Sequence, residues 1–249
     1  MSWTKTPLMS CAAAIAFIAS ASVAAAGTIV VRSTGPSARA YAPGKSIPDN
    51  SKVALKTGDV VTILDGRGTR VLRGPGTFST TAATATSTSI NQVLKNTGAR
   101  QVRTGAVRGV GGPTETSRPP NVWLVDATKS GTVCYAGTEP VSLWMPGQAD
   151  AATVTLTRVS DGKSVPLALR PGQTIKVWPE ELPVANGSEY RVARPGMSSA
   201  ATVKFVALGP NPEGLESTAA ALIRNGCNAQ LDLLIETVAV PSSTEQPSG

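Results

Sequence analysis

Histidine is absent from this 249-residue sequence, and aromatic residues make up only 4% of it. Without histidine the chain has no Ser-His-Asp or Cys-His catalytic set, no usual zinc site and no imidazole base for chemistry near neutral pH. Charged residues amount to 16%, and lysine and arginine nowhere form the dense run typical of a nucleic-acid-binding segment. These absences predict a protein that is not an enzyme, uses no cofactor or metal, and does not bind nucleic acid.

Small and turn-forming residues are abundant instead. The sequence holds 24 glycines and 19 prolines and is rich in Thr, Val and Ser. This composition favours many short strands joined by turns over long helices. The formal net charge of +7 suggests an anionic partner, but the basic residues are spread along the chain.

The N-terminus has the three parts of a secretory signal. Residues 1–7 carry one positive charge at Lys5, residues 8–23 are apolar or small, and residues 24–26 are all alanine. This pattern predicts cleavage before Gly27, export and a periplasmic location. An uncleaved membrane anchor is the alternative. It fits less well because a spanning helix needs about 20 predominantly apolar residues, and much of this stretch is Ala and Ser.

Two cysteines remain once Cys11, inside the predicted signal, is set aside. In an exported chain an even number predicts a disulfide, and Cys134 and Cys227 permit only one intramolecular pairing. Two buried free thiols are the second interpretation. A metal site ranks third, because no histidine or further cysteine is present to complete it.

Residues 27–104 predict a small β domain, a β-meander or small barrel. The expected strands are 28–32, 52–56, 60–64 and 69–73, with a strong turn signal at Asp65-Gly66-Arg67-Gly68. A short helix is expected at 90–95, ended by Gly98. Residues 105–120 are dominated by Gly, Pro and polar residues, so they predict a linker between two domains.

Residues 121–240 predict a β-sandwich followed by two short helices. Turn signals at a spacing of about ten residues separate the expected strands, which are 122–126, 132–135, 141–144, 153–159, 165–169, 174–178, 189–193 and 202–208. Asn211 is the expected N-cap of the first helix, with Pro212 at its first position and Gly226 at its end. The disulfide would then fix the helical pair to the first part of the sandwich. Residues 241–249 predict a disordered tail.

Residues 53–79 read VALKTGDVVTILDGRGTRVLRGPGTFS, with GDVV at 58–61 and then Asp65-Gly66 followed by Leu72. These positions resemble the periplasmic FecR-type β domain, in which a G-D-x-V turn precedes a return strand. The resemblance covers residues 27–79 and implies a non-catalytic β module that works by contact. Sigma-factor regulation does not carry over, because a signal peptide replaces that family's cytoplasmic segment and membrane span. The following region resembles uncharacterised alphaproteobacterial envelope proteins.

Trp123, Trp144 and Trp178 fall in or beside expected strands of the second region. Core packing is the better interpretation, because tryptophans mostly anchor cores. If exposed, they would form a sugar-binding platform or a protein hot spot. Trp178 lies at a strand end, so it is expected to be the most exposed of the three and is a candidate partner-binding residue.

Arg100, Arg103 and Arg108 belong to a sparse basic stretch at the predicted domain junction. They are candidate contacts for an anionic partner, whether a lipid headgroup, a cell-wall polymer or an acidic protein. A solvated surface is the alternative interpretation. Membrane contact is compatible with this stretch but is not predicted.

Two hydrolase-like patterns are weak. Ser160 and Lys163 have S-x-x-K spacing, but that motif needs a helix start and residues 160–163 are expected to form a hairpin turn. Glu180 and Glu181 are neighbours on a loop, whereas a glycosidase places two carboxylates about 5–10 Å apart across a cleft.

The leading hypothesis is a non-catalytic envelope protein acting as an interaction, scaffold or sensor-accessory module, with an envelope protein or anionic cell-wall component as partner. A glycan- or peptidoglycan-binding module and an unrecognised hydrolase are the alternatives.

Overall fold

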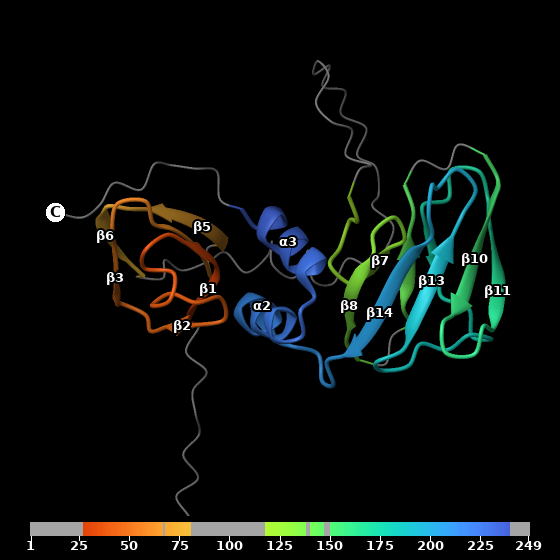
Figure 1. Ribbon diagram of the computed structural model, residues 1–249. Helices are drawn as coiled ribbons and strands as arrows, with labels where there is room; N and C mark the ends of the chain where they lie inside the picture. Colours follow the sequence, from red (N-terminus) through yellow and green to blue (C-terminus); the bar gives the residue numbers. More distant parts are fainter. Residues whose placement is uncertain (1–26, 67, 81–117, 138–139, 147–149, 240–249) are drawn as a thin grey trace, which may run out of the picture.

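The computed structural model describes residues 27–66, 68–80, 118–137, 140–146 and 150–239. In these residues the chain is mainly β with two helices near the C-terminus, which confirms the predicted fold class (Figure 1). The predicted signal (1–26), the short helix at 90–95, most of the linker (105–120) and the tail (241–249) lie outside the described residues. The division into two domains stays a prediction.

The first β unit, residues 27–80, combines two sheets. A four-stranded antiparallel sheet has the order β2-β1-β4-β5, and β3 pairs with β6 in a second sheet. Val30, Ile63 and Phe78 belong to the core between them. These described strands do not close into a barrel, so of the two predicted forms the barrel is absent from this part of the chain. The strands are β1 (Thr28–Thr34), β2 (Ser46–Ile47), β3 (Lys52–Leu55), β4 (Val60–Asp65), β5 (Gly68–Arg73) and β6 (Gly76–Ser79).

Strands β1 and β4 are buried along most of their length because both faces of their sheet are covered. One face carries Val30 and Ile63 into the core of the first β unit. The other face carries Ile29, Val31 and Leu64 into a second core that includes both helices. A strand covered on both faces loses the alternation of polar and apolar residues. The apolar runs of β1 and β4 therefore mark the surface on which the helices pack.

The turn before β4 is held by the side chain of Asp59. Its carboxylate accepts backbone N–H groups from Ser37 at 2.8 Å and Lys56 at 2.6 Å, and Gly58 supplies a φ of +84°. Burial of the carboxylate raises its pKa, but the hydrogen bonds from Ser37 and Lys56 and the charge of Lys56 outweigh this effect. The pKa of Asp59 therefore lies below its ordinary value. The Gly-Asp pair has a structural role here.

The sandwich, residues 121–207, packs a five-stranded sheet against a three-stranded sheet. Their orders are β11-β10-β13-β14-β8 and β12-β9-β7, and Leu143, Tyr190 and Phe205 lie in the core between them. Each expected strand has one counterpart, with bounds that differ by at most two residues. These are β7 (Leu124–Asp126), β8 (Gly131–Tyr135), β9 (Ser142–Trp144), β10 (Ala152–Arg158), β11 (Ser164–Leu169), β12 (Ile175–Val177), β13 (Glu189–Ala193) and β14 (Ala201–Ala207).

The two helices form a hairpin, α2 (Gly214–Arg224) followed by α3 (Asn228–Thr237). The predicted start of α2 is wrong by two residues: Glu213 is the N-cap instead of Asn211. Glu213 has extended geometry, and Gly214 then turns the chain into the helix with a φ of +79°. Gly226, with a φ of +68°, follows the end of α2 as predicted. Among the described helices none has the length and apolar character needed to cross a membrane.

This hairpin lies between the first β unit and the sandwich (Figure 1). Its buried residues, which include Leu222 and Leu234, share one core with Ile29 of β1 and with Val122 and Cys134 of the sandwich. The end of α3 also joins the first β unit, because the Thr69 N–H donates to the Val238 carbonyl at 2.9 Å. The sequence predicted only the contact of the helices with the sandwich. The hairpin in fact packs against both β units.

Candidate functional site

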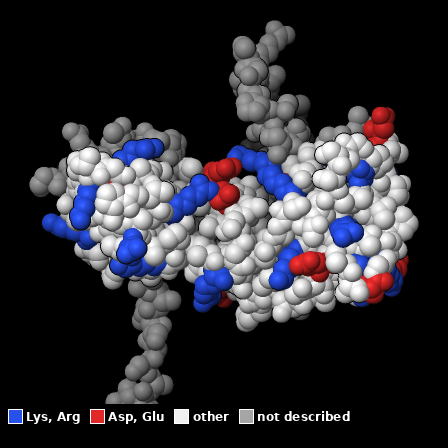
Figure 2. All heavy atoms as spheres, in the orientation of Figure 1, with Lys and Arg blue, Asp and Glu red and all other residues white. Residues whose placement is uncertain are grey.

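A cleft of about 310 Å³ lies beside α3, where the helix meets β7 and the start of β8. In Figure 2, basic and acidic side chains gather around a hollow at this junction. We call it the α3 cleft. Its apolar lining comes from Pro119, Leu124, Val133, Ala229 and Leu233, and its charged lining from Arg118, Asp126, Lys129, Asp232 and Glu236.

The charged groups of the α3 cleft form pairs at its rim. Arg118 Nη1 lies 3.8 Å from Glu236 Oε2, and both side chains are more than half exposed. Lys129 Nζ lies 3.5 Å from Asp126 Oδ2. Exposed pairs of this kind contribute only about 0–1 kcal/mol each. They can therefore exchange partners with an incoming molecule at little cost.

Asp126 is held more firmly than the rest of the rim, and Asp232 connects the rim to the first β unit. Asp232 pairs with Arg32, which comes from β1 of the first β unit. The side chain of Asp126 is 11% exposed, and its Oδ1 accepts the backbone N–H and the hydroxyl of Thr128. The cleft is thus connected to both β units and keeps a fixed acidic group on β7.

Gln230 fixes α3 against the outer edge of β8. Its side chain is almost fully buried. Oε1 accepts the Cys134 N–H at 2.6 Å, while Nε2 donates to the carbonyls of Cys134 at 2.9 Å and Val122 at 2.7 Å. The amide thus pairs with Cys134 as a residue of a neighbouring strand would, and it covers the free edge of the sheet.

The predicted disulfide is confirmed. Cys134 in β8 is bonded to Cys227, which lies between the two helices, with Cα atoms 5.8 Å apart. Both cysteines are fully buried. Together with Gln230, the disulfide gives the α3 cleft a rigid wall and attaches the helical hairpin to the sandwich.

The expectation that Trp178 is the most exposed of the three tryptophans is wrong: it is only 5% exposed, whereas Trp123 is partly exposed. Its ring packs edge-on against Tyr190 and Phe205, at 5.1 Å between centroids in each case, and its indole N–H donates to the Leu182 carbonyl. The loop after β12 folds back to supply that acceptor, which the sequence does not reveal. An indole buried in this way offers no face to a partner, so the geometry gives no support to Trp178 as a binding residue.

The other tryptophans of this region are also packed. Trp144 is 4% exposed, and Trp123 is partly buried against the core shared with the helices. The three indoles therefore do not form an exposed platform of the type expected for sugar binding. The expectation that they pack in or beside cores is confirmed.

Ser160 and Lys163 lie in the turn between β10 and β11, as expected. The Lys163 N–H donates to Asp161 Oδ1, and its side-chain Nζ donates to the Glu181 carbonyl at 2.6 Å. Both residues are exposed. The lysine is thus engaged by a backbone carbonyl, and the motif has the geometry of a turn instead of a helix start.

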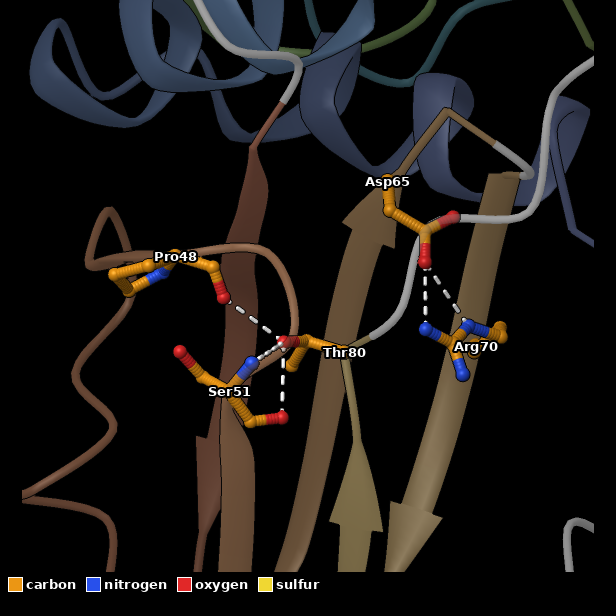
Figure 3. Close-up of polar contacts among 5 residues, drawn as sticks. All are labelled: Pro48, Ser51, Asp65, Arg70 and Thr80. Carbon is orange, nitrogen blue, oxygen red and sulfur yellow. Dashed lines mark hydrogen bonds and ion pairs between the residues drawn. The ribbon is translucent and has the colours of Figure 1, made fainter.

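Two groups of buried polar contacts lie in the first β unit (Figure 3). Arg70 donates from Nε and Nη2 to Asp65 Oδ2, at 3.1 and 2.6 Å, and the Asp65 side chain is 1% exposed. The Thr80 hydroxyl contacts the Pro48 and Ser51 carbonyls at 2.9 and 3.1 Å, and it accepts the Ser51 N–H. Such mutually satisfied groups fix strand ends and loops. We assign them a structural role.

Arg100, Arg103 and Arg108 lie outside the described residues. Within the described part of the chain, no three Asp, Glu or Cys side chains gather as a metal site requires. Comparison with known proteins found no matching family model, no similar curated protein and no similar solved structure. The FecR-type resemblance therefore stays a prediction.

The residues that make this cleft were not predicted from the sequence. Gln230 carries the one usable signal, since it lies among the apolar positions of α3 that pack on the sandwich. A polar residue on such a face must find buried partners. Asp126, Lys129, Asp232 and Glu236 carry no such signal, because isolated charges at a strand end, a turn and a helix surface are common.

Proposed function

We propose that this protein is exported, cleaved before Gly27, and acts without catalysis as an interaction module that receives a protein partner in the α3 cleft. The observation that carries the proposal is the cleft itself. It combines an apolar lining with charges of both signs, and its walls are fixed by the disulfide and by Gln230. Rigid walls reduce the entropy lost on binding.

A protein segment suits this lining better than an anionic polymer does. Three carboxylates, from Asp126, Asp232 and Glu236, face two cations, from Arg118 and Lys129. A polyanion would meet repulsion from the carboxylates, whereas a segment with charges of both signs can complement the rim. The apolar lining would accept one or two aliphatic or aromatic side chains of such a segment.

Export is supported by the disulfide, because disulfides persist in oxidising compartments and are rare in the cytosol. The predicted signal supplies the second argument. Intact mass measurement of the protein from the extracytoplasmic fraction tests this part directly. The expected first residue is Gly27, and a retained N-terminus in the cytosolic fraction would contradict export.

Site-specific photo-crosslinking tests the cleft as a binding site. A crosslinking amino acid at Lys129 is compared with one at Lys204, which is exposed on β14 and does not line the cleft. We expect a discrete protein adduct from position 129 only, weakened by Glu236→Lys but not by Glu189→Lys. Equal adducts from both positions, or adducts to polysaccharide alone, would contradict the proposal.

A further inference from the structure

The backbone nitrogen of Gly27 lies 2.8 Å from Oε2 of Glu216, and it donates its hydrogen to that carboxylate. Gly27 immediately precedes β1, and Glu216 lies in the first turn of α2. The contact joins residues 189 positions apart in the chain and links the first β unit to the helical hairpin. It occupies the point at which the sequence predicts signal cleavage.

Both oxygens of the Glu216 carboxylate are turned toward the first β unit. Oε1 accepts the hydroxyl of Ser46 at 3.0 Å, and Ser46 lies on β2, which pairs with the start of β1. An acidic residue in the first turn of a helix is common, since it interacts favourably with the helix dipole. That general preference does not explain why both oxygens contact another part of the molecule.

Glycine is the residue that permits this approach. A Cβ atom placed on Gly27 would lie 3.0 Å from Glu216 Oε1 and 3.2 Å from Oε2. Both distances are tighter than most Cβ contacts, so with a larger residue the carboxylate would have to shift by a few tenths of an ångström. The absence of a side chain at position 27 is therefore matched to the position of Glu216.

We infer that Glu216 is a receptor for the new α-ammonium group of Gly27, so that removal of the signal completes the docking of the first β unit onto α2. This inference rests on the proposed cleavage before Gly27. Hydrolysis of the Ala26–Gly27 peptide bond consumes one water and leaves a carboxylate on Ala26 and an ammonium on Gly27. The uncut chain offers Glu216 one neutral amide N–H, and the cut chain offers it a charged donor.

The consequence is that the mature fold is more stable than the precursor fold. A hydrogen bond between charged groups is roughly twice as strong as one between neutral groups, and the contact is partly buried, so solvent screens it less than a surface pair. An α-amino group has an ordinary pKa of about 7.7–8.0, so it is mostly protonated at neutral pH. The ion pair would hold β1 and β2 against α2 only after processing.

The test compares two chains that differ only in their first residues. One begins at Gly27, and the other keeps Ala24–Ala26 and so moves the ammonium three residues away. We expect the chain that begins at Gly27 to have a Tm about 2–4 °C higher, a shift of the size that one such interaction gives a protein of this length. Glu216→Gln should abolish this difference.

Glu213→Gln is the matched control. Glu213 is exposed, lies three residues before Glu216 and makes no side-chain cap, so it reports the general effect of losing an acid from this helix end. The difference between the two chains should persist in this variant. A difference that also persists in Glu216→Gln would overturn the inference.

The cleavage site and the receptor role of Glu216 can be overturned separately. Recovery of exported protein with another first residue overturns both the cleavage site and the receptor. Equal Tm values for the two wild-type chains, with exported protein that begins at Gly27, overturn the receptor alone. This comparison needs no variant, so it remains decisive if Glu216→Gln fails to fold.

Discussion

Replacing Gln230 with leucine tests whether hydrogen bonds, and not only apolar packing, hold α3 against β8. The substitution keeps most of the side-chain volume but removes the partners of three backbone groups, the N–H and C=O of Cys134 and the C=O of Val122. A buried polar group left without a partner costs about 1–3 kcal/mol. The added apolar burial of leucine returns about 1–2 kcal/mol.

The net expectation is a loss of about 1–8 kcal/mol in the free energy of unfolding. Urea denaturation followed by tryptophan fluorescence measures it, because Trp144 and Trp178 lie in or beside the sandwich core and report loss of its packing. A protein of ordinary stability has a free energy of unfolding of about 5–15 kcal/mol, so it would lose a large share of it.

Gln173→Leu is the matched control. Gln173 also bonds two backbone groups, accepting from the Arg170 N–H and donating to the Ile175 carbonyl, but it does so on an exposed turn. Water can replace both bonds there, so we expect a loss below about 1 kcal/mol. Equal losses in the two variants would refute the view that Gln230 acts by satisfying buried groups.

Two further changes test the elements on either side of the hairpin. The double variant Cys134→Ala/Cys227→Ala removes a bond that closes a 93-residue separation; the loop-entropy model gives a loss of about 4–5 kcal/mol, measurable by calorimetry against the wild-type protein under non-reducing conditions. Asp59→Asn should destabilise the first β unit most above the ordinary carboxyl pKa, because the lowered pKa of Asp59 contributes stability that is fully present there and is lost as pH falls below about 4. Thermal denaturation from pH 7 to pH 3 should therefore show the two proteins converge, and a constant difference would contradict this assignment.

Local patterns made the sandwich predictable. Its strands alternate apolar and polar residues and are separated by Gly, Pro and Asp turns, so sequence alone located each one within two residues. The disulfide followed from simple counting of cysteines in a chain expected to be exported. Both inferences use information that is confined to a few neighbouring residues or to composition.

Long-range contacts account for what the sequence did not reveal. Trp178 is buried because a loop after its strand returns to accept its indole N–H, and no local pattern encodes that return. Helix α2 begins later than predicted because Gly214 adopts a positive φ. The favourable Asn-Pro pair before it does not signal that conformation. The α3 cleft joins a turn, a strand end and a helix, so its charges come together only in the folded chain.

Leu222→Ala tests whether the helical hairpin makes the two β units unfold together. Leu222 is fully buried in the core that also contains Ile29 of the first β unit and Val122 of the sandwich. Loss of its side chain should cost about 2–5 kcal/mol. Because the damaged core is shared, tryptophan fluorescence from the sandwich and amide hydrogen exchange in β1 and β4 should report the same decrease in stability. If exchange in β1 and β4 accelerates while the fluorescence transition stays at its wild-type midpoint, the two β units are only loosely coupled, and the hairpin stabilises the first β unit alone.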